Sequence, residues 1–199
     1  MSDIFLRTDV EIEALKTLEL LDMHLKYVER DPYQWKWIIL ALHSLIQNVM
    51  VLYLTRGNDF HVFRVSKSKE QREIFWEIEN NNNFENIGKL RLAGFGVLYD
   101  AIKSSDNVNH AFSATSTHND AMKKLNDFRN SFIHFAPTGW SLQVNQFPDL
   151  CCIVLSIVEH SISTGEIVGW FLDGEDETFV DLFTSVAERF EALKLTYAA

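Results

Sequence analysis

Cysteine is scarce in this chain, and its placement excludes the sites that cysteine usually builds. The 199 residues include two cysteines, Cys151 and Cys152, which are adjacent. Neighbouring residues of a helix point about 100° apart, so a disulfide between them would be strained. No Cys-x-x-Cys spacing occurs, which argues against a structural zinc site. We therefore expect buried thiols in a reducing compartment, with neither a metal nor another cofactor.

Basic residues are outnumbered by acidic ones, 18 to 28, which gives a net charge of −10. A protein that coats nucleic acid generally needs a basic field, so this balance argues against that class. It leaves room for a small basic cleft.

Long apolar runs are also missing. The most apolar region, 37–54, is divided by four polar residues, His43, Ser44, Gln47 and Asn48. A membrane span needs roughly 20 mostly apolar residues, so this region predicts a core helix. The N-terminus lacks the basic segment and apolar stretch of a signal peptide. We expect a soluble, cytoplasmic protein that does not bind membranes.

Two motifs of common enzymes are absent as well. The chain has no Walker loop and no Gly-x-Ser-x-Gly elbow. The segment Gly94-Phe95-Gly96 lacks the third glycine and the preceding strand of a phosphate loop. Each glycine costs about 1 kcal/mol of helix propensity in the helix predicted there, which we interpret as a sign of close helix approach.

The chain does show helical periodicity, and capping residues mark the ends of the predicted helices. Hydrophobic residues make up 47% and aromatic residues 13%, enough for one sizeable core. Capping residues and apolar spacing predict helices over about 8–28, 32–56, 86–104, 117–135, 148–164 and 175–195, with a polar helix over 66–79. Strand alternation, repeats and linkers are not evident. We expect a single all-α domain over 1–199, a bundle of about six helices.

The helix predicted over 117–135 separates into two faces. Its apolar residues, spaced 4, 3, 4 and 3, are Ala121, Leu125, Phe128, Phe132 and Phe135. They fall within a stripe of about 80°, which predicts the face on the core.

Polar residues occupy the other side of this helix. Asn126, Asn130 and His134 lie about 140–180° from the stripe centre, and Lys123 joins them. Arg129 is at the flank, where its stem can lie along apolar surface. Met122 and Ile133 border the polar row, so this face could form a second interface, most commonly a symmetric dimer.

The hexapeptide Arg129-Asn130-Ser131-Phe132-Ile133-His134 resembles the Arg-x4-6-His motif of the HEPN superfamily. The run 125–135 looks like that family's motif helix, and 42–49 resembles its packing helix more weakly. As a pattern the resemblance covers about 35–162, although the motif helix is its specific part. It implies a HEPN-like fold and a metal-independent endoribonuclease, often part of a toxin–antitoxin or phage-defence system.

The resemblance also implies roles for individual residues. His134 would take the proton of a ribose 2′-hydroxyl, since imidazole titrates near neutral pH. Arg129 would stabilise charge on the scissile phosphate, and Asn130 would orient the histidine or the phosphate. Two motifs would meet across a homodimer. Lys123, Lys124 and Asn126 would bind the RNA.

Other interpretations stay open. The chain could be a catalytically silent HEPN-like interaction module, for instance the regulatory partner of a nucleotidyltransferase-type protein. Arg129 and His134 could also be a structural pair at a dimer seam or a chance match. Among the remaining histidines, His43 is expected to be a satisfied core residue, and His160 to lie on a solvated helix face. His110 and His118 lack metal-ligand spacing.

Overall fold

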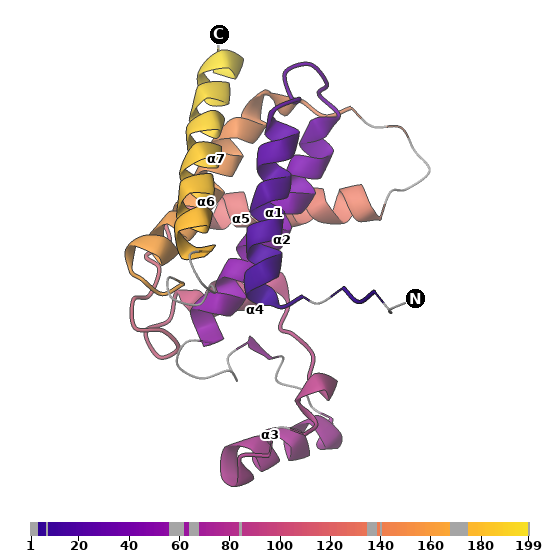
Figure 1. Cartoon of the computed structure of the whole chain (residues 1–199), viewed down its shortest axis with the longest axis vertical. Coiled ribbons are helices and arrows are strands. Elements are labelled where there is room, and N and C mark those ends of the chain that lie inside the picture. Colours follow the sequence, from indigo (N-terminus) through magenta and orange to yellow (C-terminus); the bar gives the residue numbers. More distant parts are fainter. Residues whose placement is uncertain are drawn as a thin grey trace.

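The computed structural model describes residues 4–6, 8–55, 62–63, 68–83, 85–134, 139, 141–167 and 175–198. Across these residues the chain is an all-α helical bundle, as the sequence predicts (Figure 1). The α-helices are α1 (Val10–Leu25), α2 (Gln34–Thr55), α3 (Lys69–Asn81), α4 (Phe95–Ile102), α5 (Ser116–Ile133), α6 (Phe147–Ser163) and α7 (Glu175–Ala198).

The helix α2 is the centre of the bundle. It packs against α1, α4, α5 and α6. Because it has neighbours on most sides, its residues are buried in every turn, from Trp35 through Leu42 to Tyr53. Within the described part of the chain, it is also the helix with the length and apolar composition of a membrane span, but 67% of that stretch is buried inside the bundle. Its position is therefore that of the predicted core helix.

The helix α1 begins at Val10, two residues after the predicted start. The side chain of Asp9 accepts a hydrogen bond of 2.8 Å from the backbone nitrogen of Ile12, which caps one of the free N–H groups of the first turn. Residues at helical spacing, such as Leu18 and Leu21, are completely buried against α2 and α7. Asp22 also forms an ion pair of 3.6 Å with Arg189 of α7.

The helix α3 stands apart from the bundle (Figure 1). Its buried residues Ile74 and Ile78 form a small cluster with Leu90, separate from the main core. The helix ends at Asn82, which adopts the left-handed conformation with φ 51°. The polar helix expected over 66–79 is thus present, two to three residues further along the chain.

The helix predicted over 86–104 is much shorter than expected. Ile87–Lys89 forms a 3-10 turn, Leu92 pairs with Phe63 in an isolated β-bridge, and α4 begins only at Phe95. Gly94 stands before α4 with extended dihedrals, φ −66° and ψ 154°. A Cβ added to Gly94 or Gly96 would meet nothing within 4 Å. Our interpretation of these glycines as a close helix approach was therefore wrong.

Candidate functional site

The helix that carries the motif is α5, and its ends are well defined. The hydroxyl of Thr115 accepts from the backbone nitrogen of His118, and the imidazole of His118 accepts from the backbone nitrogen of Thr115, forming a capping box. The helix ends at Ile133. His134 follows with φ −99° and ψ 57°, and its backbone nitrogen donates to the carbonyl of Asn130 over 2.9 Å. Phe135 lies outside the described residues.

The buried face of α5 is rotated from the predicted stripe. Ala121 and Leu125 are buried, and Phe128 and Phe132 pack against the core, as the spacing predicts. Met122, which we placed beside the polar row, is buried as well. The rotation has a physical cause: α2 and α4 cover one flank of α5 while α6 covers the other, so the buried arc is wider than the apolar stripe.

Asn126 shows the consequence of this rotation. Its Oδ1 lies 3.2 Å from Nε2 of His43 on α2, so its predicted outward position was wrong. His43 is buried and stacks on the ring of Phe95 with centroids 4.1 Å apart. Burial lowers the pKa of His43 to about 4, and the positive charge of Arg129 adds to this, although the bond to Asn126 opposes it. His43 is thus the satisfied core histidine that the sequence predicts.

Neutral His43 fixes the orientation of the Asn126 amide. The Oδ1 atom of an amide can only accept, so Nε2 of His43 carries the hydrogen. The amide nitrogen of Asn126 is then the group that remains for another partner, and it is a donor.

The three motif residues lie at the C-terminal end of α5. Arg129 and Asn130 are half-buried, and His134 is exposed. Nη1 of Arg129 donates to Oδ1 of Asn130 over 3.0 Å, which orients both polar groups. A separation of five residues turns by about 140° on a helix, so Arg129 and His134 point in different directions from one α5. Figure 1 shows this end of the helix projecting beyond α1 and α2.

The two lysines of α5 line different cavities. Lys123 borders a cavity of about 390 Å³ between α4 and α5, which Asn126 also lines. Lys124 borders a cavity of about 240 Å³ on the side of α6. The structure therefore brings Lys123 and Asn126 together and separates Lys124 from them.

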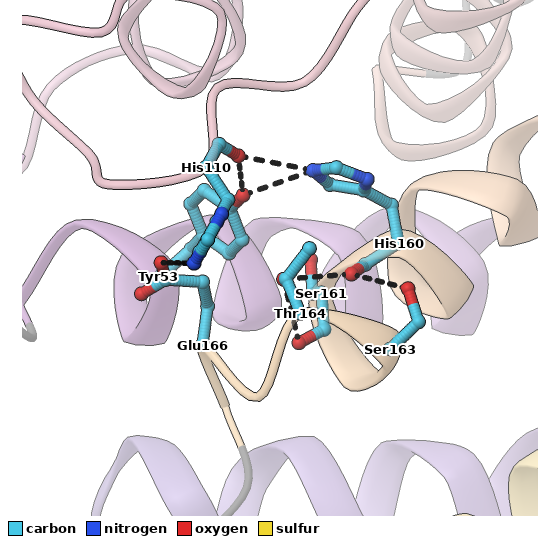
Figure 2. Close-up of polar contacts among 7 residues, drawn as sticks. All are labelled: Tyr53, His110, His160, Ser161, Ser163, Thr164 and Glu166. Atoms are coloured by element: carbon cyan, nitrogen blue, oxygen red, sulfur yellow. Dashed lines mark hydrogen bonds and ion pairs between the residues drawn. The ribbon is translucent and has the colours of Figure 1, made fainter.

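A second polar cluster, which we did not predict from the sequence, joins α2, α6 and the loop before α5 (Figure 2). The hydroxyl of Tyr53 donates to the carbonyl oxygen of His110, and Nε2 of His160 lies 3.0 Å from that oxygen and 3.1 Å from the Tyr53 hydroxyl. His160 is half-buried, so its predicted position on a solvated face was wrong. Burial raises the pKa of Tyr53 to about 12, and the nearby charge of Glu166 also raises it.

The end of α6 places Glu166 in this cluster. Gly165 has φ 70°, its backbone nitrogen donates to the carbonyl of Ile162, and that of Glu166 donates to the carbonyl of Ser161. This is the Schellman arrangement, in which glycine tolerates the left-handed conformation. The buried carboxylate of Glu166 then lies 4.0 Å from Nε2 of His110.

The hydrogen bonds of this second cluster have a structural role. The hydroxyls of Ser163 and Thr164 donate to the carbonyl of His160, as Figure 2 shows, and that of Ser161 donates to the carbonyl of Ile157. None of these three is placed as a nucleophile beside a base. The bonds from Tyr53 and His160 to the loop carbonyl hold the segment that leads into α5, and so support the N-terminal end of the motif helix.

No protein-family model matches this chain, and no curated protein or solved structure matches it either. The function therefore has to be argued from the residues of the chain itself.

Proposed function

We propose that this chain is a HEPN-like, metal-independent endoribonuclease whose active site is completed by a second copy of the chain. The observation that carries the proposal is the group Arg129, Asn130 and His134 at the end of α5, in which the arginine and asparagine are joined at 3.0 Å and the histidine is exposed. An all-α bundle that includes this helix agrees with the resemblance in the sequence. A role in a toxin–antitoxin or defence system is part of the same proposal.

The proposed reaction needs a general base, a general acid and a group that stabilises negative charge. The imidazole of His134 takes the proton of a ribose 2′-hydroxyl, and the 2′-oxygen then forms a bond to the adjacent phosphorus. The bond from phosphorus to the 5′-oxygen breaks, and a protonated His134 of the second copy supplies the proton that this oxygen needs. Arg129 stabilises the negative charge on the phosphoryl oxygens, and Asn130 holds the guanidinium in place.

The need for a second copy follows from the geometry of one helix. Arg129 and His134 diverge by about 140° around α5, so one copy does not direct both groups at one phosphate. Two copies related by a twofold axis can bring the arginine of one towards the histidine of the other. The half-apolar end of α5, where Ile133 is 49% exposed, suits such a contact.

The test is cleavage of varied RNAs in EDTA. We expect the wild type to cut RNA and the His134→Ala variant to lose at least about 100-fold in rate, the usual contribution of a general base. His110→Gln is the matched control, because it removes another exposed imidazole and is expected to leave the rate unchanged. Thermal unfolding of both variants shows whether a loss of rate reflects a loss of folding.

A dilution series tests the composite site. Cleavage per chain should fall as the protein is diluted below the concentration at which two copies associate. Intact RNA with the wild type at every concentration would contradict catalysis and favour the silent interaction module, for instance one that binds a nucleotidyltransferase-type protein. Constant activity of a demonstrated monomer would contradict the shared site.

A further inference from the structure

The cavity between α4 and α5 has a chemical character that the motif alone does not explain. Its lining combines polar and aromatic side chains from both helices: Phe95, Tyr99, Asp100, Lys103, Asn119 and Lys123, with Asn126 at the side nearer the motif. Its volume of about 390 Å³ lies within the usual range of roughly 300–1,000 Å³ for small-ligand sites.

The hydrogen-bonding groups of this cavity are mostly donors. His43 engages Oδ1 of Asn126, and Lys103 reaches Oδ1 of Asn119 over 3.5 Å. The amide nitrogens are therefore what each asparagine has left to offer a ligand. Tyr99 is 5% exposed, and its buried hydroxyl has no hydrogen-bond partner among the residues that the structure describes. Because that hydroxyl is closed off from the cavity, the donors open to a ligand are the two amide nitrogens and the lysine ammonium groups.

The charges of the cavity favour the same kind of ligand. Lys103 forms an ion pair of 2.7 Å with Asp100, and its ammonium lies 4.2 Å from the centroid of the Tyr99 ring. Asp100 therefore neutralises Lys103, and the exposed Lys123 contributes the remaining positive charge. Donors with one net positive charge suit an anion that accepts several hydrogen bonds, as a phosphate does.

The cavity lies on the same face of α5 as Asn130 and His134 of the motif. Asn119, Lys123, Asn126, Asn130 and His134 follow one another at spacings of four, three, four and four residues. Residues at such spacings share a side of a helix, and four residues advance by about 6 Å. A strand laid along α5 would thus reach the cavity within one or two nucleotides of the motif.

We propose that this cavity binds a backbone phosphate of the RNA strand, next to the phosphate held by Arg129. Lys123 supplies the charge, the amide nitrogens of Asn119 and Asn126 donate to the phosphate oxygens, and His43 acts as a positioning residue for Asn126. This inference rests on the proposed ribonuclease function and names the part of the substrate that the α4–α5 side would hold.

Binding to an uncleavable probe tests this separately from catalysis. The probe is a short fluorescein-labelled RNA with 2′-O-methyl groups throughout, which lacks the attacking hydroxyl, and the measurement is fluorescence anisotropy on the full chain. We expect Lys123→Gln to weaken binding about tenfold while the variant folds as the wild type does.

Two further lysines serve as comparisons. Lys16→Gln changes the net charge by the same amount as Lys123→Gln, but Lys16 is on α1, away from the cavity. This variant should leave binding unchanged. Lys124→Gln, on the α6 side of α5, should weaken binding less than Lys123→Gln does. Equal losses for Lys123 and Lys124, or no loss for Lys123→Gln, would overturn the phosphate site.

A competition experiment distinguishes a strand from a free nucleotide. Adenosine monophosphate should displace the probe only weakly, because it supplies one of the two phosphates. Tight binding of the free nucleotide that depends on Lys123, with no effect of Lys123→Gln on the probe, would overturn the assignment to RNA. If the variants behave as expected but unmodified RNA is never cut, the proposed catalysis fails while binding at this cavity stands.

Discussion

The Nε2 atom of His43 lies 3.2 Å from Oδ1 of Asn126, and this contact joins the central helix α2 to the motif helix α5. It fixes the rotation of α5 about its axis at one point. Asn126 is three residues before Arg129 and four before Asn130, so the same rotation decides where the motif side chains point. A buried contact between two neutral polar groups thus supports the geometry of the exposed site.

Removing one partner of this contact should cost more than removing both. We expect Asn126→Ala to lower the free energy of unfolding by about 1–3 kcal/mol, because it leaves the buried imidazole of His43 unsatisfied. The double variant His43→Leu with Asn126→Ala should lose less than Asn126→Ala alone, because no buried imidazole is then left unsatisfied. Urea unfolding of the wild type, of the single variants His43→Leu and Asn126→Ala, and of the double variant measures this. Asp127→Ala, at an exposed neighbouring position, is the control and should change stability by less than about 0.5 kcal/mol.

Stability should fall in mildly acidic solution through the same residue. The pKa of His43 is lowered from 6.5 to about 4 by burial, so the unfolded chain takes up its proton at a higher pH than the folded chain does. The stabilisation is complete above pH 6.5 and is lost progressively as pH falls towards 4, by an amount on the order of 2 kcal/mol. His43→Leu should flatten the pH dependence of unfolding in this window. An unchanged slope would contradict a neutral buried His43.

Two glycines should respond to alanine in opposite directions. Gly165 has φ 70° in the Schellman turn after α6, so Gly165→Ala should lower the free energy of unfolding by about 1 kcal/mol. Gly96 lies in the first turn of α4 with open space where a Cβ would lie, so Gly96→Ala should raise it by up to about 1 kcal/mol. Thermal unfolding compares the two. Destabilisation by Gly96→Ala would instead support our first interpretation, that a neighbouring helix approaches closely at this glycine.

The cysteines should be unreactive in the folded protein. Cys151 is completely buried, and burial raises the pKa of its thiol well above 9.0. Burial also raises the pKa of Cys152 to about 12, with a further contribution from Glu191. Because the thiolate is the reacting form, a disulfide reagent such as dithionitrobenzoate at pH 8 should label neither quickly, and both should react on unfolding. Rapid labelling of one thiol in the native protein would show that its side chain is accessible.

Much of the fold could be read from local sequence. The predicted helix starts, 8 and 117, fall within two residues of the caps Asp9 and Thr115, whose side chains bond to backbone nitrogens a few residues away. The apolar spacing of α1, α2 and α7 identifies buried faces because the helix repeat is fixed by backbone hydrogen bonds. The 3-10 turn and extended backbone before Phe95 could not be read in this way, because residues 86–94 have apolar spacing that also fits a helix.

In the candidate site, too, some features follow from local sequence and others from tertiary packing. The sequence by itself determined that Arg129, Asn130 and His134 lie near the end of one helix, and the helix repeat places Asn130 and His134 on one side of it. Only the tertiary structure decided that Asn126 turns inward to His43, that Lys123 and Lys124 serve different cavities, and that Tyr53 and His160 secure the loop before α5. The hydrogen bonds among these contacts join residues 50 to 107 positions apart. The packing of whole helices against α2 sets them, and no local spacing encodes it.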